Sequence, residues 1–153
     1  MSLVSILRGV ELFNGLSVGE IANIASICHE QRFNKGDQII IAGDLGNLMF
    51  VITDGFVQVS IGSGQKERVL VKLGSGQIIG EMALVDNGPR SATVKAITTP
   101  TIVQVIRHED FDQICNKDYH IGYVVMRNLA SDLSFKLRHR NLNESGPEWQ
   151  SVK

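Results

Sequence analysis

Several residue patterns that support enzyme chemistry are missing from this chain of 153 residues. Its two cysteines, Cys28 and Cys115, lie far apart, and its four histidines show neither the H-x-H nor the H-x-x-x-H spacing of metal ligands. No serine, cysteine or threonine belongs to a recognisable nucleophile motif. We therefore predict that the chain is not an enzyme, with no catalytic residues, no metal site and no required cofactor. The cysteines are expected to act as small core residues in a reducing compartment.

Strong net charge and long apolar runs are lacking too. The net charge is −1, so the whole molecule offers no electrostatic attraction to nucleic acid or to an anionic membrane. No apolar run approaches the roughly 20 residues that a membrane span needs. The N-terminus lacks the basic start, the apolar middle and the cleavage site of a secretory signal. We expect a cytoplasmic protein with no nucleic-acid or membrane partner within this chain.

The chain does have the composition of a soluble globular protein, with 43% hydrophobic and 20% charged residues in a length that suits one domain. Near its start, Ser17 and Glu20 have the spacing of a helix capping box. Apolar residues then recur with a helical period at positions 21, 24, 25 and 28. This pattern predicts a helix over about 18–30, preceded by a looser helical stretch over about 3–12.

From residue 33 to residue 107 the pattern is that of short strands separated by glycine-bearing turns. Asp54-Gly55 lies between two of these runs and predicts a β-hairpin. The regular spacing of the runs favours a sandwich, a barrel or a jelly roll over a parallel α/β sheet. The predicted strands are 38–42, 48–53, 56–61, 68–73, 91–97 and 101–106.

Helical periodicity returns after the last predicted strand. It predicts a short helix at 108–117 and a long helix at 122–143. Apolar residues form a stripe at i+4 steps along the long helix: Val125, Leu129, Leu133 and Leu137. Few apolar residues follow, so residues 143–153 are expected to form a mobile tail, and residues 1–142 one domain that includes the flanking helices.

The stretch GEMALVDNGPRSATV, residues 80–94, is the most informative part of the sequence. It resembles the phosphate-binding cassette of cyclic nucleotide-binding domains, which runs Gly-Glu-x-Ala-Leu, a short loop, and then Arg followed by small residues. The turns at Gly36, Gly43 and Gly55 also match that family, and the resemblance covers roughly residues 10–140. It implies a mainly β fold with flanking helices, namely a β jelly roll (double-stranded β-helix) with N-terminal helices and a long C-terminal helix.

The physical chemistry of the cassette residues agrees with a ligand site. Arg90 offers a planar donor fork that matches an anionic oxygen of a 3′,5′-cyclic phosphate. Glu81 would repel the phosphate, but its carboxylate accepts a hydrogen bond from a hydroxyl, and by resemblance it binds the ribose 2′-OH. Gly80, Ala83 and Ala92 are small enough to let the ligand approach closely.

The remaining expected contacts come from the rest of the cassette and from the long helix. Met82 lies in a short helical turn expected at 81–84, whose backbone N–H groups would suit an anion. Ser91 resembles the bacterial catabolite-activator type, in which this residue supports phosphate binding, so we favour cAMP as the ligand, with cGMP as the other possibility. Because the long helix has no Trp or Tyr beyond its start, Arg140 and Asn141 are the polar candidates for contact with the base, together with Arg138.

Plainer interpretations stay open for the same residues. Glu81 and Arg90 could form a surface ion pair without any ligand. Ser91 could be a small strand residue, and the polar residues of the last helix could simply be solvated.

The resemblance implies a cyclic nucleotide sensor of the catabolite-activator kind, without a DNA-binding domain, in which ligand binding moves the C-terminal helix. We also expect a homodimer through that helix. The alternatives are a sensor for another anionic ligand, a jelly-roll interaction module, a cupin-type metalloenzyme, and a fragment of a larger cyclic-nucleotide-regulated protein. Neither the composition nor the motifs identify a downstream partner.

Overall fold

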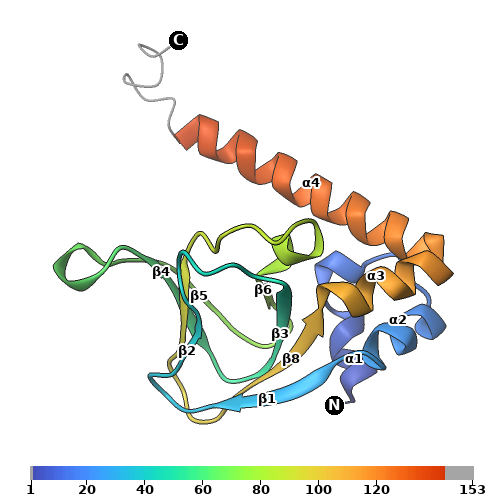
Figure 1. The fold of residues 1–153 in the computed structure, drawn as a ribbon, viewed down its shortest axis with the longest axis horizontal. Coiled ribbons are helices and arrows are strands. Elements are labelled where there is room, and N and C mark those ends of the chain that lie inside the picture. The colour runs from blue at the N-terminus through green and yellow to red at the C-terminus, as the bar shows by residue number, and fades with distance from the viewer. Residues whose placement is uncertain (1, 144–153) are drawn as a thin grey trace.

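Helices form both ends of the chain and strands fill its middle, in the order that the sequence predicts (Figure 1). A computed structural model describes the backbone of residues 2–143 and the side chains of residues 2–139. The helical elements are α1 (Leu3–Arg8), η1 (Glu11–Phe13), α2 (Val18–Ala25), η2 (Gly64–Lys66), η3 (Glu81–Leu84), α3 (His108–Lys117) and α4 (Tyr119–Asn143). The strands are β1 (His29–Phe33), β2 (Gln38–Ile40), β3 (Leu48–Asp54), β4 (Val57–Ile61), β5 (Arg68–Leu73), β6 (Ile78–Ile79), β7 (Thr93–Ala96) and β8 (Thr101–Arg107).

The predicted capping box opens α2. The Ser17 hydroxyl accepts a hydrogen bond from the backbone N–H of Glu20 at 3.1 Å, and Oε1 of Glu20 accepts one from the backbone N–H of Ser17 at 2.9 Å. The helix ends at Ala25, well before the predicted end at residue 30, because the chain turns into β1, whose backbone pairs with β8. The side chains of β1 are mostly exposed and polar, so no apolar alternation marked this segment as a strand.

The described strands form two four-stranded antiparallel sheets. One sheet has the order β1-β8-β3-β6 and the other has the order β2-β7-β4-β5. Except between β4 and β5, each successive strand lies in the opposite sheet, which is the winding of a jelly roll. The predicted fold class is therefore confirmed.

The hairpin predicted at Asp54-Gly55 is wrong. The strand before it, β3, pairs with β8 and β6, and the strand after it, β4, pairs with β5 and β7. Gly55 has a φ of +81°, so the expected turn is present, but it carries the chain from one sheet to the other. A tight-turn motif reports the local backbone, whereas the choice of pairing partners depends on the whole fold.

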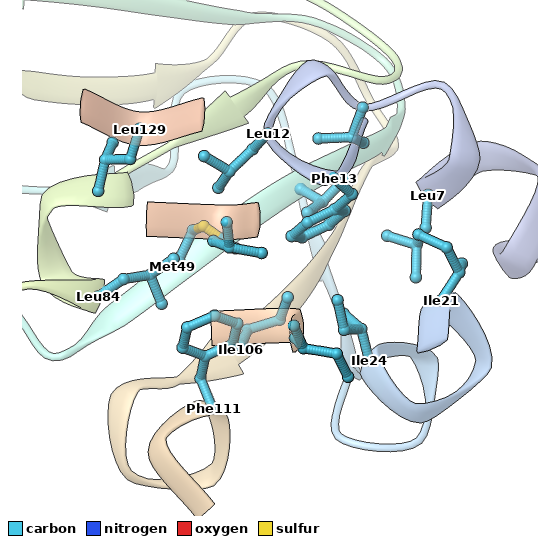
Figure 2. Packing of buried hydrophobic residues seen from close by; sticks show 14 residues of the cluster. Leu7, Leu12, Phe13, Ile21, Ile24, Met49, Leu84, Ile106, Phe111 and Leu129 are labelled. Atoms are coloured by element: carbon cyan, nitrogen blue, oxygen red, sulfur yellow. The ribbon is translucent and has the colours of Figure 1, made fainter. Parts of the chain in front are cut away.

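Two apolar clusters hold the elements together. The larger one collects buried side chains from the helices at both ends of the chain and from β3, η3 and β8 (Figure 2). The smaller one lies between the two sheets and includes Phe50, Ile52 and Val103. Cys28 and Cys115 pack against the larger cluster, as expected of small core residues, and burial is the main cause that raises their pKa to about 12 and about 11.

The long helix α4 passes over η3, and its last turns rise away from the strands (Figure 1). Of the predicted stripe, Val125 and Leu129 are buried and Leu133 packs against the larger cluster. Leu137 is 58% exposed, so the stripe leaves the core within the last turns of the helix.

Two polar contacts fix the first half of α4. The amide Nδ2 of Asn128 donates hydrogen bonds to the carbonyl oxygens of Leu12 and Asn14, both at 2.9 Å. At the start of the helix, Nδ1 of His120 lies 2.6 Å from Oε2 of Glu20, the oxygen that the capping box leaves free. The predicted tail begins at the last residue of α4, and residues 144–153 lie outside the described part of the chain.

Candidate ligand-binding site

A cleft of about 1470 Å³ opens between the roll and α4. Its walls come from the sheet β2-β7-β4-β5 and from β6, from η3 and the segment after it, from the segment around η1, and from the middle of α4. The seven cassette residues predicted as ligand contacts all line this cleft: Gly80, Glu81, Met82, Ala83, Arg90, Ser91 and Ala92. The structure thus brings them together in one place, while their roles as ligand contacts stay predictions.

The helical turn expected at 81–84 is present as η3. Gly80 precedes it in a left-handed conformation with a φ of +74°, which favours glycine. A Cβ at this position would also lie 2.8 Å from Nη1 of Arg90 and 3.0 Å from the carbonyl oxygen of Leu48. The backbone N–H of Ala83 donates to the carbonyl oxygen of Gly80 at 3.0 Å, so this N–H group is already used within the turn.

The backbone around Arg90 is pinned to the loop before β3. Its N–H group donates to the carbonyl oxygen of Asp44 at 2.7 Å, and its own carbonyl oxygen accepts from the N–H of Gly43 at 2.9 Å. In the side chain, Nη2 donates to the carbonyl oxygen of Leu48 at 2.7 Å. Partial burial lowers the pKa of the guanidinium, which nonetheless stays charged at neutral pH because an arginine pKa begins so high.

Gly46 leaves the space that the Arg90 side chain occupies. A Cβ on Gly46 would overlap the Nε and Cζ atoms of the Arg90 guanidinium. Gly46 is not among the glycines with positive φ, so the requirement for glycine here is one of room and not of backbone conformation. The turn glycines found by sequence reasoning gave no indication of this packing role.

The Glu81 carboxylate contacts a cation other than Arg90. Its Oε1 lies 3.7 Å from Nζ of Lys136 on α4, and the same ammonium lies 3.0 Å from Oδ2 of Asp132. No ion pair joins Glu81 to Arg90 among the described side chains, so the proposed surface pair between them is not what the structure contains. The Glu81 carboxylate and the Arg90 guanidinium therefore line the same cleft without forming an ion pair with each other.

Several residues of α4 that line the cleft were missed by sequence reasoning, among them Asp132, Phe135 and Lys136. Of these, Phe135 is 60% exposed, and its ring lies 4.1 Å from that of His139, centroid to centroid. Arg138 is exposed and is not part of the lining. The predicted base contacts Arg140 and Asn141 belong to the last turns of α4, where side chains lie outside the described part of the chain.

Other kinds of site find little support. Within the residues that the structure describes, no group of three or more His, Cys, Asp or Glu side chains could hold a metal ion. This observation gives no support to the cupin-type alternative. None of the described helices combines the length and the apolar character needed to cross a membrane.

The fold and the cleft together define an antiparallel jelly-roll domain with a wide cleft, large enough to admit a small molecule, beneath α4. The sequence profile of the cyclic nucleotide-binding domain matches residues 30–118. The chain therefore belongs to the cyclic nucleotide-binding domain family, a family of regulatory domains, as its cassette predicted.

Individual relatives agree with this assignment. The chain is 31% identical over 137 residues to the cyclic AMP receptor protein of Thermus thermophilus, a match that covers 89% of this chain and 61% of that protein. The crystal structure of the N-terminal domain of a transcriptional regulator from Streptomyces coelicolor A3(2) superposes with a TM-score of 0.79 at 28% identity, covering 88% of this chain and 94% of that one. The regulatory domain of Toxoplasma gondii PKA, solved with cAMP, gives a TM-score of 0.67 at 28% identity over 73% of this chain and 42% of that one.

The match spans less than two thirds of the length of the curated relatives, at 61% of the Thermus thermophilus protein and smaller shares of the next ones. What those whole proteins act on or assemble with is consequently not carried over to this chain.

Proposed function

We propose that the chain is a sensor domain that binds cAMP in the cleft beneath α4. The observation that supports this most directly is that Glu81 and Arg90 line one cleft without pairing with each other. A cyclic nucleotide has a partner for each of them. Its cyclic phosphate is an anion that suits the guanidinium fork, and its ribose 2′-OH is a donor that suits the carboxylate.

The choice of cAMP over cGMP depends on the cassette and on a relative. Ser91 follows Arg90 as in the catabolite-activator type, and the domain from Toxoplasma gondii was solved with cAMP. Phe135 is a further candidate for contact with the base, since an aromatic ring on the cleft wall can stack on a purine. Titration with cAMP, cGMP and a cyclic dinucleotide, followed by thermal unfolding, would rank these ligands because a ligand of the native state raises the Tm.

The expected affinity is moderate. Roughly two dozen ligand heavy atoms at about 0.3 kcal/mol each give about 7 kcal/mol. This free energy corresponds to a Kd on the order of 10 μM, and a preorganised cleft would bind more tightly.

The Arg90→Ala variant tests the assignment of the phosphate contact. Loss of a charged hydrogen bond costs about 1.5–3 kcal/mol, so cAMP affinity should fall by roughly tenfold or more in isothermal titration calorimetry. Arg32→Ala is the matched control, because Arg32 lies on β1, is paired with Glu30 and does not line the cleft. Equal affinity of the Arg90 variant and the wild type would contradict the proposal.

Ligand binding is proposed to shift the second half of α4, in which Lys136 contacts Glu81 on η3 while Phe135 and Leu137 are exposed. Hydrogen exchange over this part of α4 should change when cAMP is added, and unchanged exchange would refute the movement.

A homodimer through the same helix is also proposed, because the exposed side chains of Phe135 and Leu137 suit an interface between two copies. The protein is proposed to be cytoplasmic. A strict monomer in ultracentrifugation, with and without ligand, would exclude that dimer.

The alternatives are separated by the same titration. A rise in Tm with a different anion alone would identify a sensor for that anion. No response to any nucleotide would favour an interaction module. If the natural chain is longer, this domain would be the sensor of a larger protein. The match to only 61% of the Thermus thermophilus protein is compatible with that alternative.

A further inference from the structure

The ammonium of Lys136 stands between two carboxylates that belong to different parts of the molecule. Asp132, four residues earlier on α4, is its nearer partner at 3.0 Å, and Glu81 on η3 is the more distant one at 3.7 Å. The Glu81 side chain is only 18% exposed, whereas Lys136 is 59% exposed. Lys136 therefore joins the cleft-facing side of α4 to a largely covered carboxylate on η3.

We propose that Lys136 competes with the ligand's hydroxyl group for the Glu81 carboxylate and thereby weakens ligand binding in this domain. This inference rests on the proposed function, in which Glu81 accepts a hydrogen bond from the ribose. The Lys136 ammonium lies near Oε1 of Glu81, so a ribose hydroxyl that bonds to the same oxygen would displace or share that contact. Asp132 makes this exchange easy, because Lys136 keeps its nearer ion pair when Glu81 is taken.

The local charges make the expected sign of a Lys136 variant diagnostic. The pKa of Lys136 is lowered by partial burial, but the bond to Asp132 and the charge of Glu81 outweigh that effect and raise it, so the side chain is a cation at neutral pH. Removing a cation from the wall of a cleft that binds an anion should weaken binding by simple electrostatics. Competition for Glu81 predicts the opposite result.

The experiment compares cAMP affinity by calorimetry for the wild type, Lys136→Met, Glu81→Gln and the double variant. Lys136→Met should bind about two- to fivefold more tightly, since exposed ion pairs contribute at most about 1 kcal/mol, which is about fivefold. In the Glu81→Gln background the same substitution should give no gain. Arg127→Met is the matched control, because Arg127 lies on α4, is exposed and does not line the cleft, and its loss should leave affinity unchanged.

A second arm uses Asp132→Asn, which frees Lys136 to bind Glu81 alone. Because Asp132 is itself an anion on the cleft wall, its direct effect on cAMP must be measured in the Lys136→Met background. The effect of Asp132→Asn on cAMP affinity is then compared between the wild type and the Lys136→Met variant. Competition predicts that Asp132→Asn is less favourable to binding in the wild type, where Lys136 is present. Coupling of the opposite sign, or none, would count against the competition.

The outcomes distinguish a failure of the Lys136 competition from a failure of cAMP binding itself. If the wild type binds cAMP but Lys136→Met binds it equally or more weakly, the competition is wrong and the proposed function stands. If the wild type binds no cyclic nucleotide, both are wrong. If Lys136→Met tightens binding in both the wild-type and the Glu81→Gln background, Lys136 acts on the ligand by another route and the inference fails.

Discussion

The first half of α4, residues 119–131, and its second half, residues 132–143, differ in their contacts with the rest of the protein. In the first half, Leu129 is 2% exposed and the Asn128 amide is bonded to the carbonyl oxygens of Leu12 and Asn14. In the second half, Phe135 is 60% and Leu137 58% exposed, and the ion pair from Lys136 to Glu81 links the helix to η3. The first half is part of the core, while the described side chains of the second half contribute the partly buried Leu133 and contacts that are individually weak.

This difference shows that one helix can contribute to the core with one half while its other half is held by fewer buried contacts. A change in the second half breaks few apolar contacts, so its free-energy cost is small compared with the stability of a domain. Movement of the first half would open the main core and is far less accessible. If the proposed ligand binds beside Phe135, it would contact the half of α4 that is less buried.

The largest expected difference between the halves lies in stability. Leu129→Ala should lower the free energy of unfolding by about 2–4 kcal/mol, because it leaves a cavity in the larger apolar cluster. Leu137→Ala, the same change two turns further along the helix, should stay within about 0.5 kcal/mol of the wild type. Urea denaturation followed by circular dichroism gives both values. Similar losses for the two variants would remove the distinction on which the comparison rests.

A smaller effect is expected on ligand affinity in the second half. Phe135→Ala should weaken cAMP binding by about three- to tenfold, the range of one aromatic stacking contact, while leaving the unfolding midpoint nearly unchanged. Tyr123→Ala is the control, since Tyr123 is an exposed aromatic residue of the first half that does not line the cleft. If both variants bind cAMP as the wild type does, Phe135 is no more than a surface residue.

The smallest effect concerns pH and the start of α4. The hydrogen bond to Glu20 raises the pKa of His120 above its ordinary value of 6.5, so the stability from this pair is fully present below pH 6.5 and is lost as pH rises through the raised pKa. The Ser17 backbone N–H, followed by His120, lowers the Glu20 pKa below 4.5, so the Glu20 contribution persists above pH 4.5 and is lost only as pH falls through the lowered pKa.

The His120→Gln variant tests this window. Its Tm should lie below that of the wild type between about pH 5 and pH 6.5, and the difference should shrink toward pH 9. Thermal unfolding at a series of pH values, at constant ionic strength, measures it. If the Tm difference between the two proteins does not depend on pH, the imidazole stabilises the fold through packing and not through its charge.

Most of the fold could be predicted because its signals are local. The capping box at Ser17, the run of short strands and the helical stripe each depend on residues that are close in sequence. The errors share a different cause. β1 is an exposed strand defined by pairing with the distant β8, and the Asp54-Gly55 turn joins strands whose partners lie elsewhere.

The cleft shows the same division. The cassette residues 80–83 and 90–92 are close in sequence, so the motif predicted that they would line the same cleft. The α4 residues depend on where a distant helix crosses the roll, and the polar candidates chosen from sequence lie past the point where Phe135 and Lys136 reach the cleft. The i+4 spacing of Asp132 and Lys136 was visible, but nothing in the sequence indicated that Glu81 would be close to them.

The room that Gly46 leaves for the Arg90 side chain has a consequence for comparing relatives of this domain. A methyl group at position 46, far upstream of the cassette, could displace the Arg90 guanidinium although the cassette sequence itself is unchanged. A homologue can therefore keep the whole signature while its arginine side chain takes another position, so the residue aligned with Gly46 should be inspected together with the motif.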